Sequence, residues 1–403
     1  MPTKYTGLDF YNIDAQLTEE ERDMRDSIRE WVEDRFLSLD PETGLSVIES
    51  HCAKGTFPLD AVKEFGEYGA LGVNLTGYGC PGLSNVAYGL VCQELERADS
   101  GLRSFASVQG SLCMFPIWKF GSEEQKRKYL PKMASGELIG CFGLTEPDHG
   151  SNPGGMVTTA TDAGDHYVLN GAKMWITNGT IADLAIVWAK LDSTSSRAIR
   201  GFIVEKDDIG FTAPEMKGKH SLKASITSEL VFQECKIPKD RILPHPDASG
   251  LTGPFSCLNN ARYGIAWGAL GAAQSCFHSA RDYTMERTQF DKPLASFQLV
   301  QNKLAWMLRE ITKGQLLALQ LGRMKDDGTL IPEQISLAKM NNVDIALQIA
   351  RMARDMHGAN GILAEYPIMR HMANLESVFT YEGTHDIHNL ILGRWITGHQ
   401  AFV

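Results

Sequence analysis

The stretch DHYVLNGAKMWITNGTIADLAIVWAKL, residues 165–191, decides the fold class of this chain. It consists of short runs of alternating, β-branched or aromatic residues separated by Asn-Gly turns, a pattern typical of β-strands. Two further runs, IRGFIVEKD at 199–207 and ELVFQECKIP at 229–238, have the same character, and DSTSSR at 192–197 is typical of a hairpin loop. These runs predict a small β domain in the middle of the chain.

Both flanks of this β region have helical patterns. Thr18 and Glu21 stand at the spacing of a capping box before an amphipathic run, and Ser122 and Gln125 repeat that spacing further on. The last part of the chain again has long runs of helical period, which imply an antiparallel bundle because such apolar helices cannot stand alone. We therefore predict an α+β fold of three domains: an all-helical N-terminal domain at 1–139, a small β-barrel or sandwich at 140–250, and a C-terminal four-helix bundle at 251–403.

The composition disfavours several kinds of partner. With 39 basic and 49 acidic residues the chain carries a formal net charge of -10, so nucleic acid and anionic lipid are not expected as partners. No run of 18 apolar residues exists, so we expect no membrane span. The eight cysteines form no C-x-x-C pair, as is typical of reduced thiols. The first residues resemble neither a signal peptide nor a transit peptide, which favours the bacterial cytoplasm, or the mitochondrial matrix if a transit peptide has been removed.

The C-terminal stretch TYEGTHDIHNLILGR, residues 380–394, contains a candidate catalytic carboxylate. His385 and His388 are spaced as two metal ligands on a helix could be, but no H-E-x-x-H, C-x-x-C or clustered Asp pattern occurs elsewhere, so we expect no metal site. Thr384 is suited to cap the helix that follows. Glu382 then lies just before the cap, in a Gly-containing turn from which a carboxylate can reach a neighbouring cleft.

Two glycine-containing segments could approach a bound nucleotide. HGANG at 357–361 follows a helical run, and its glycines could let backbone amides come close to a phosphate. FGLTEPDHGSNPG at 142–154 lies at the seam between the helical and β domains, where small-molecule sites tend to form. Taken alone, the first is a C-cap turn and the second a loop. No G-x-G-x-x-G follows a strand, so a Rossmann site is not supported.

The motifs are more specific together, and in their order, than any one of them is alone. Along the chain stand ELERADSGLRSFASVQ, GLTEPDHGSNPGGM, WITNG, CLNNARYGIAWGALG, ERTQFDKPLASFQLVQNKLA, DMHGANGI and TYEGTHDIHNLILGR. As a set they resemble the acyl-CoA dehydrogenase family over essentially the whole chain, and most closely its glutaryl-CoA dehydrogenases. The resemblance implies a homotetramer of subunits with helical, β and helical domains, FAD bound between them, and electron-transfer flavoprotein as the electron acceptor.

Carried over residue by residue, the resemblance implies three groups of FAD contacts. The flavin ring and its ribityl chain would meet Phe142, Leu144, Thr145, Ser151, Trp175, Ile176 and Thr177. The adenosine pyrophosphate would be held from a neighbouring subunit by Arg287, Phe290, Gln298, Asp355, His357, Gly358 and Ala359. Thr384 and Asp386 of the first subunit would close the site. Asn152, His149 and Ala359 depart from the residues usual in the family, which bears on the charge of the 142–154 loop and on the geometry around the flavin phosphates.

The same resemblance implies the place of the substrate and the reaction. The acyl-CoA would run past Ser151, Phe255, Leu258, Asn259 and Arg262, beside Tyr381 and Gly383, with Glu382 as the base. An acyl thioester has a weakly acidic α-C–H, so its removal needs a carboxylate in a dry pocket where desolvation raises the pKa. The β-hydride would pass to the flavin.

Arg103 bears on which acyl group is bound. It is the only cation in a run of small and apolar residues, an expensive place for a charge without an anionic partner, which Glu96 or Asp99 could supply. In glutaryl-CoA dehydrogenases the matching arginine binds the distal carboxylate of the substrate, with residues matching Glu96, Ser104, Ser107 and Tyr381 nearby.

We therefore predict the oxidation and decarboxylation of glutaryl-CoA to crotonyl-CoA and CO2. Three alternatives remain open at this point. The chain could be a dehydrogenase or oxidase of a short monocarboxylic acyl-CoA, an enzyme that stops at glutaconyl-CoA, or a non-catalytic scaffold or CoA-binding module of the same fold.

Overall fold

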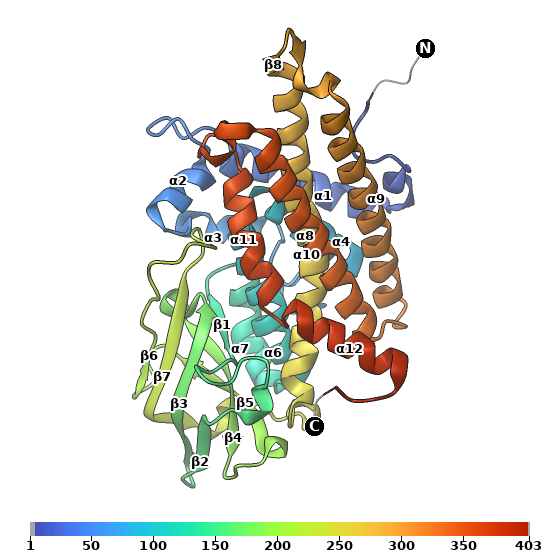
Figure 1. The fold of residues 1–403 in the computed structure, drawn as a ribbon. Helices are drawn as coiled ribbons and strands as arrows, with labels where there is room; N and C mark the ends of the chain where they lie inside the picture. Colours follow the sequence, from blue (N-terminus) through green and yellow to red (C-terminus); the bar gives the residue numbers. More distant parts are fainter. Residues whose placement is uncertain (1–4, 402–403) are drawn as a thin grey trace.

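Helices from both ends of the chain lie beside a sheet built from its middle in the computed structural model, which describes residues 5–401 (Figure 1). Seven helices precede the sheet: α1 Glu19–Val32, α2 Val47–Lys54, α3 Val62–Glu67, α4 Asn85–Ala98, α5 Ser100–Ser107, α6 Phe115–Phe120 and α7 Glu123–Ala134. Thr18 and Ser122 cap α1 and α7, and both predicted capping boxes are formed. A π-helical stretch, Val108–Met114, joins α5 to α6. The predicted helical N-terminal part is confirmed.

The middle of the chain forms one sheet of seven strands in the order β1-β4-β2-β3-β7-β6, with β5 paired to β4 off this path. The strands are β1 Gly140–Gly143, β2 Thr159–Asp162, β3 His166–Thr177, β4 Leu184–Leu191, β5 Ile199–Glu205, β6 Phe211–Thr212 and β7 Thr227–Pro238. β4 and β5 are antiparallel, so residues 192–197 form the loop of a hairpin, as predicted.

The two Asn-Gly pairs of the stretch 165–191 behave differently. Asn178-Gly179 follows β3 directly, with Asn178 at φ 68°, and the next strand, β4, pairs with β1, β2 and β5 rather than with β3. Asn170-Gly171, which the pattern predicts to be a turn, lies inside β3, so that prediction is wrong. The β3–β7 register shifts beside Gly171, and a Cβ there would come within 2.5 Å of Thr158 Oγ1. This glycine allows a bulge and a close backbone approach.

The last part of the chain returns to helices. These are α8 Thr252–Glu286, α9 Gln298–Asp326, α10 Pro332–Met356, α11 Ile368–Thr380 and α12 His385–Thr397, and a small hairpin of β8 Thr288–Gln289 and β9 Lys292–Pro293 joins α8 to α9. Met307 and Ile311 of α9 are buried in the core of this bundle with residues of α8, α10 and α11, which confirms the predicted bundle. Within the described part of the chain, no helix combines the length and the apolar composition that a membrane crossing needs.

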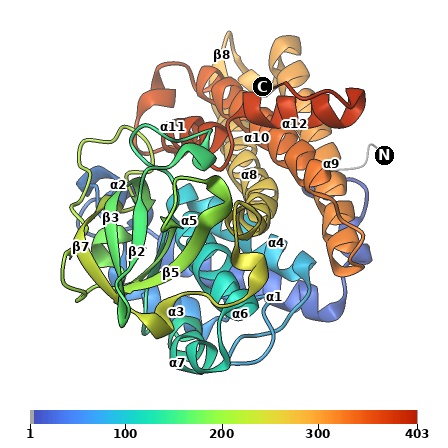
Figure 2. The ribbon, with the colours of Figure 1, turned by 90° about the horizontal axis from the view of Figure 1, so that it is seen from below.

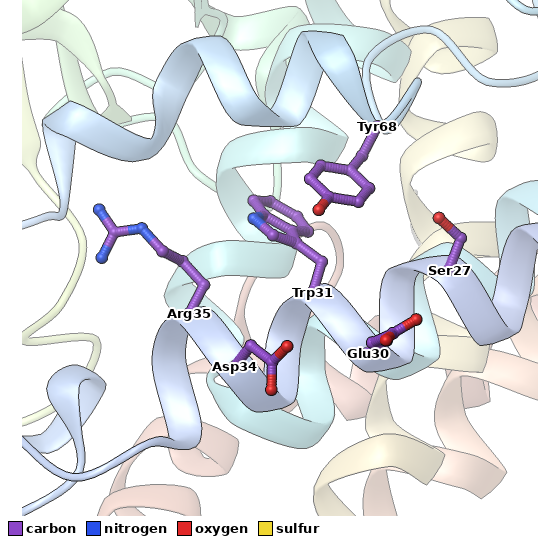
Figure 3. Close-up of a pocket in the computed structure, with 6 residues that line it drawn as sticks. All are labelled: Ser27, Glu30, Trp31, Asp34, Arg35 and Tyr68. Carbon is purple, nitrogen blue, oxygen red and sulfur yellow. The ribbon is translucent and has the colours of Figure 1, made fainter.

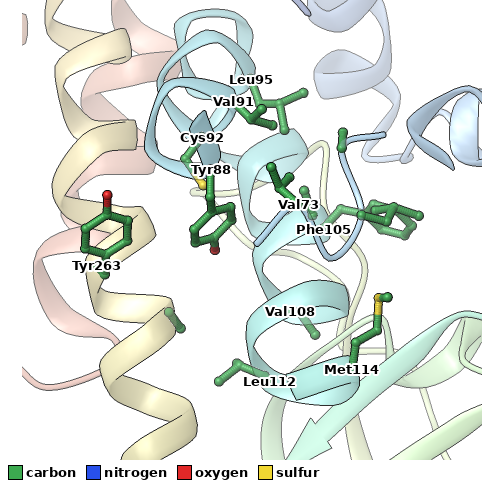
Figure 4. Packing of buried hydrophobic residues seen from close by; sticks show 14 of the residues in the cluster. Val73, Tyr88, Val91, Cys92, Leu95, Phe105, Val108, Leu112, Met114 and Tyr263 are labelled. Carbon is green, nitrogen blue, oxygen red and sulfur yellow. The ribbon is translucent and has the colours of Figure 1, made fainter. Parts of the chain in front are cut away.

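The helices of the two ends share one hydrophobic core. Figure 4 shows Tyr88, Val91 and Cys92 of α4 between Tyr263 of α8 and Phe105 of α5. The rings of Tyr88 and Tyr263 stack with their centroids 6.1 Å apart. In Figure 2 the sheet lies to one side of the molecule, and α5 and α8 lie between it and the outer helices. The shared core therefore fixes α5 relative to α8.

Asp99 links four distant segments of the chain. Its buried carboxylate accepts hydrogen bonds from the Gly101 amide at 2.6 Å, Arg370 Nη1 at 3.0 Å and Asn374 Nδ2 at 2.8 Å. Arg370 also reaches Glu49 in α2 at 2.7 Å. The Asn374 side chain accepts the Leu222 amide, between β6 and β7, at 2.7 Å. Because Asp99 caps the N-terminus of α5, these contacts fix that helix against α2, α11 and the segment between β6 and β7.

Candidate active site

A short turn between α11 and α12 presents Glu382. α11 ends at Thr380, and Thr384 caps α12 by accepting the Ile387 amide at 3.2 Å, as predicted. Glu382 has φ +54° and Gly383 has φ +97°. A left-handed conformation is uncommon for a residue with a side chain and costs on the order of 1–3 kcal/mol, so surrounding contacts must hold it.

The Glu382 side chain is half-buried, with one of its carboxylate oxygens fully buried. Its Oε2 atom is buried and accepts no hydrogen bond from residues 5–401. Burial raises the pKa of Glu382, while the positive charges of Arg103, Arg262 and Lys339 oppose that rise. A buried acceptor without a partner is costly, and such orphan groups are typical of functional sites. The carboxylate is thus suited to take a proton from a group placed against it.

Arg262 and Lys339 reach the same turn from two other helices. Arg262 of α8 donates from Nε to the Glu382 carbonyl at 2.6 Å. Lys339 of α10 donates to the carbonyls of Gly383 at 3.0 Å and Tyr381 at 3.1 Å. The Arg262 guanidinium also lies 3.4 Å from Asn259 Oδ1, so this predicted substrate residue is tied to the turn. The conformation of the turn is therefore set by α8 and α10.

Arg103 lies beside the turn, in α5, and is 1% exposed. Its Nε donates to Glu96 Oε2 at 2.6 Å, and its Nη2 donates to the Tyr381 hydroxyl, which also lies 3.3 Å from Ser104 Oγ. Burial raises the pKa of Tyr381 to about 12, so the phenol stays protonated. The Nη1 group donates to none of the described residues and is left for another acceptor. Of the two anionic partners considered from the sequence, Glu96 pairs with Arg103.

The sequence predictions missed a glycine that makes this pair possible. A Cβ on Gly268 of α8 would come within 2.1 Å of Glu96 Oε2 and 3.2 Å of the Arg103 side chain. Glu96 is fully buried, and its other oxygen accepts from Ser100 Oγ at 2.8 Å. Ser107, which was predicted beside Arg103, has its hydroxyl 3.5 Å from the Tyr88 hydroxyl.

The segments predicted to meet the flavin ring lie side by side. The Met174 amide donates to the Thr145 carbonyl at 2.8 Å, which joins the loop after β1 to the end of β3. The buried Lys173 ammonium donates hydrogen bonds to the Glu146 carboxylate at 2.8 Å and to the Leu144 carbonyl at 3.2 Å. Trp175 is 63% exposed, has φ +62° and sits where the β3–β7 register shifts. An exposed indole held by a bulge offers a flat face to a planar ring.

The other residues of these segments differ in exposure. Phe142, Leu144 and Ile176 are buried, Thr145 and Thr177 are half-buried, and Ser151 is exposed. His149 closes a tight turn in which its backbone exchanges two 3.2 Å hydrogen bonds with Glu146. Asn152 lies beyond that turn and is exposed. Two of the three departures from the usual family pattern therefore lie in a loop whose base is fixed by Lys173 and Glu146.

The predicted acyl-CoA residues of α8 lie near its start. Phe255 is 38% exposed, and Leu258 packs against the shared core. Asn259 and Arg262 continue the same stretch of helix toward the Glu382 turn.

The residues predicted to bind the adenosine pyrophosphate lie far from Glu382 on the same chain. They stand around the β8–β9 hairpin and the end of α10, at the opposite end of the bundle from the α11–α12 turn (Figure 1). Arg262 and Arg287 are separated by about 38 Å along α8 at 1.5 Å per residue. Arg287, Phe290 and Gln298 are exposed, and Gly358 and Ala359 are exposed in the turn after α10. One chain does not bring the two groups together.

His357 and Asp355 of this second group have partners of their own. The His357 ring is buried and donates from Nδ1 to the Ala353 carbonyl at 2.8 Å. Its Nε2 lies 3.2 Å from Ser279 Oγ, and the ring stacks on Tyr283. Asp355 forms an ion pair with Lys303. His357 therefore offers a ligand its backbone rather than its ring.

The two histidines of the C-terminal stretch do not form a metal centre with acids or cysteines. Among residues 5–401 no cluster of three or more His, Cys, Asp or Glu side chains has the geometry of a metal site. His385 stacks on Phe379 with the ring centroids 4.4 Å apart. His388 is buried, and burial together with Lys339 and Arg262 lowers its pKa to about 3. Asp386 is exposed at the start of α12.

A separate hollow lies on the N-terminal helices. It is lined by Ser27, Glu30, Trp31, Asp34, Arg35 and Tyr68, with the Tyr68 ring stacked on the Trp31 indole (Figure 3). None of these side chains belongs to the site around Glu382.

Three family models match most of the chain. Residues 18–137 match the acyl-CoA dehydrogenase N-terminal domain, residues 141–235 the middle domain and residues 248–397 the C-terminal domain. The chain belongs to the acyl-CoA dehydrogenase family, a class of oxidoreductases.

Solved structures and curated sequences give particular relatives. A crystal structure of glutaryl-CoA dehydrogenase from Mycobacterium smegmatis is 54% identical, with a TM-score of 0.94 over 99% of this chain and 100% of that one. A glutaryl-CoA dehydrogenase structure from the same organism in complex with FADH2 is 51% identical, with the same TM-score and coverage. The short-chain specific acyl-CoA dehydrogenase of Clostridium acetobutylicum is 33% identical over 94% of this chain and 98% of its own length.

Proposed function

We propose that this chain is an FAD-dependent dehydrogenase that converts glutaryl-CoA to crotonyl-CoA and CO2. The observation that carries the substrate assignment is the buried Arg103 beside the Glu382 turn. Its Nε and Nη2 groups donate hydrogen bonds to Glu96 and Tyr381, whereas its Nη1 group has no acceptor among the described residues. A guanidinium in a dry site is well suited to a carboxylate, which it can bind by charge-assisted hydrogen bonds. A substrate with a thioester at one end and a carboxylate at the other matches this pair of groups.

The chain supplies residues suited to hold the flavin ring. The exposed Trp175 face, the adjacent Thr145 and the loop pinned by Lys173 fit a planar ring with polar edges. FAD, when bound there, supplies the acceptor for the hydride that leaves the β-carbon. The Glu382 carboxylate removes the α-proton at the same time, and its Oε2 atom is buried away from solvent.

Decarboxylation follows from the chemistry of the oxidised substrate. Oxidation places a double bond between the α- and β-carbons, and the distal carboxylate is attached to the neighbouring γ-carbon, in a vinylogous relation to the thioester carbonyl. The bond to that carboxylate can therefore break, releasing CO2 and leaving its electron pair in the conjugated system. Glu382, now protonated, returns its proton to the γ-carbon. Arg103 orients the carboxylate, the Tyr381 hydroxyl accepts from Arg103, and Ser104 Oγ lies 3.3 Å from that hydroxyl.

The remote group of cofactor residues supports a shared site. Because Arg287 and the 355–359 turn lie at the opposite end of the bundle from Glu382, they would reach the cofactor of a neighbouring subunit in a homotetramer. Electron-transfer flavoprotein is the proposed acceptor of the electrons. The domain limits 1–139, 140–250 and 251–403 belong to the same proposal.

A short-chain monocarboxylic acyl-CoA is the second candidate substrate. It is favoured by the short-chain specific relative and by the fact that Arg103 already has the anionic partner Glu96. In that case Arg103 would be structural, and the other groups of the site would keep their roles.

Product analysis separates these possibilities. The purified holoenzyme is incubated with glutaryl-CoA or butyryl-CoA and an artificial electron acceptor, and the thioesters are identified by mass spectrometry. We expect crotonyl-CoA and CO2 from glutaryl-CoA. Accumulation of glutaconyl-CoA would remove the decarboxylation step, and turnover of butyryl-CoA alone would overturn the substrate assignment.

A further inference from the structure

Lys339 is a buried cation that the proposed chemistry does not use. It lies in α10 and is 1% exposed. Its ammonium donates to the carbonyls of Gly383 at 3.0 Å, Tyr381 at 3.1 Å and Phe379 at 3.4 Å. An ammonium group has three donors, so each N–H has one acceptor in this segment.

The three acceptors surround the residue proposed as the base. Phe379 lies in the last turn of α11, where carbonyls have no partner within the helix and favour a cation. Tyr381 and Gly383 flank Glu382, whose own carbonyl accepts from Arg262 at 2.6 Å. Two cations from two helices therefore hold the backbone on both sides of a residue at φ +54°.

We propose that Lys339 is a positioning residue for Glu382: its ammonium holds the strained turn so that the carboxylate keeps its direction, and its positive charge stabilises the ionised carboxylate. The proposal rests on the assignment of Glu382 as the base. Direction matters because a misplacement of about 1 Å in a reacting group can cost about 10²-fold in rate.

The protonation of Lys339 gives this role a pH dependence. A neutral amine has two donors, so one of the three carbonyls would lose its hydrogen bond. Burial lowers the pKa of Lys339 to about 7; Glu382 opposes this shift, and Arg262 and Arg103 add to it. His388 of α12 faces the same cluster and is neutral, since its pKa is lowered to about 3. Activity should therefore fall on the alkaline side as Lys339 loses its proton.

The variants Lys339→Met and Lys339→Arg test whether Lys339 positions Glu382 through its charge and hydrogen bonds, or only fills the space beside the turn. Methionine keeps the unbranched stem of the lysine side chain up to Cε and removes the charged group with its donors, whereas arginine stays charged at every accessible pH. Lys219 provides the matched control, because its half-buried ammonium also donates to three oxygens, those of the Leu222 carbonyl at 2.9 Å, the Ser225 carbonyl at 2.5 Å and Thr227 Oγ1 at 2.8 Å. These lie in the chain between β6 and the start of β7.

The measurement is kcat and KM for glutaryl-CoA across pH 5 to 10, with FAD content determined for each holoenzyme. For Lys339→Met we expect kcat to fall about 10- to 100-fold with KM and FAD content nearly unchanged. The acid limb of its kcat–pH profile should move to higher pH, because the lost positive charge no longer favours the ionised Glu382. Lys339→Arg should recover part of kcat and lose the alkaline limb. Lys219→Met should keep the rate and the pH profile of the unaltered enzyme.

Two results would overturn the proposal. One is a Lys339→Met enzyme with the original kcat and both original limbs. The other is a Lys339→Arg enzyme whose alkaline limb coincides with that of the unaltered protein, and this comparison decides the matter if the methionine variant does not fold. Absence of turnover in the unaltered enzyme would instead contradict the proposed function, so the two failures are distinguishable.

Discussion

The role of Arg103 is tested most sharply by removing it together with the charge of its partner. Arg103→Ala alone would leave Glu96 as an uncompensated buried charge, a change that typically costs about 3–5 kcal/mol of stability. The double variant Arg103→Ala/Glu96→Gln avoids this, since the amide can keep the 2.8 Å contact with Ser100 Oγ. Glu96→Gln alone is the matched control, because it retains the guanidinium.

The expected effect follows from the geometry of the guanidinium. Nε and Nη2 are engaged by Glu96 and Tyr381, so Nη1 is the group left to meet the distal carboxylate of the substrate. Truncating one side of such a buried, charge-assisted contact costs about 2–5 kcal/mol. At about 1.36 kcal/mol per tenfold, even the low end changes a ratio of specificity constants about 30-fold. Butyryl-CoA has no carboxylate and makes no such contact.

The assay is steady-state kinetics on glutaryl-CoA and butyryl-CoA with one artificial electron acceptor. Losses of FAD or of folded protein affect both substrates alike, so the ratio of their kcat/KM values isolates the carboxylate contact. We expect the double variant to shift this ratio toward butyryl-CoA by at least about 30-fold, and Glu96→Gln to shift it much less. Equal losses for the two thioesters in the double variant would refute the reasoning and make Arg103 a structural partner of Glu96.

Three further predictions concern the base, the assembly and the packing of α5. Glu382→Gln keeps the shape of the side chain but not the proton acceptor, so rapid-mixing absorbance should show flavin reduction slowed by at least about 10²-fold with FAD still bound; reduction at the original rate would place the base elsewhere. If Arg287 and the 355–359 turn reach a neighbour's FAD, flavin loss and subunit dissociation should occur together in sedimentation at decreasing concentration, and a monomer that retains FAD tightly would contradict the shared site. Asp99→Ala removes a buried partner of Arg370 and should lower the free energy of unfolding by about 3–5 kcal/mol in urea titrations; an unchanged midpoint would mean that Arg370 finds compensation in Glu49.

Local patterns in the sequence were sufficient for the helices and for the ends of several of them. The capping boxes at Thr18 and Ser122 and the cap at Thr384 depend on residues only three positions apart, so the chain itself specifies them. The β region between two helical parts follows from the period of its side chains in the same way. Strand pairing does not, as Asn170-Gly171 shows: the pair is a turn by local preference but a bulge once β3 lies between β2 and β7.

Within the site, the sequence by itself singled out Glu382 by its place before a helix cap and Arg103 as a lone cation among apolar residues. The same reasoning, applied to Lys339 in the run SLAKMNNVDIAL, could have marked it as a second buried cation. Only the tertiary structure decided which groups these charged side chains bind. Arg103 pairs with Glu96 across a gap that Gly268 leaves open, and Lys339 bonds carbonyls some 40 residues further along the chain. Helical periodicity fixes which face of a helix a residue occupies, but the contacts of that face depend on which helices pack together, and this is set by the summed burial of the whole core.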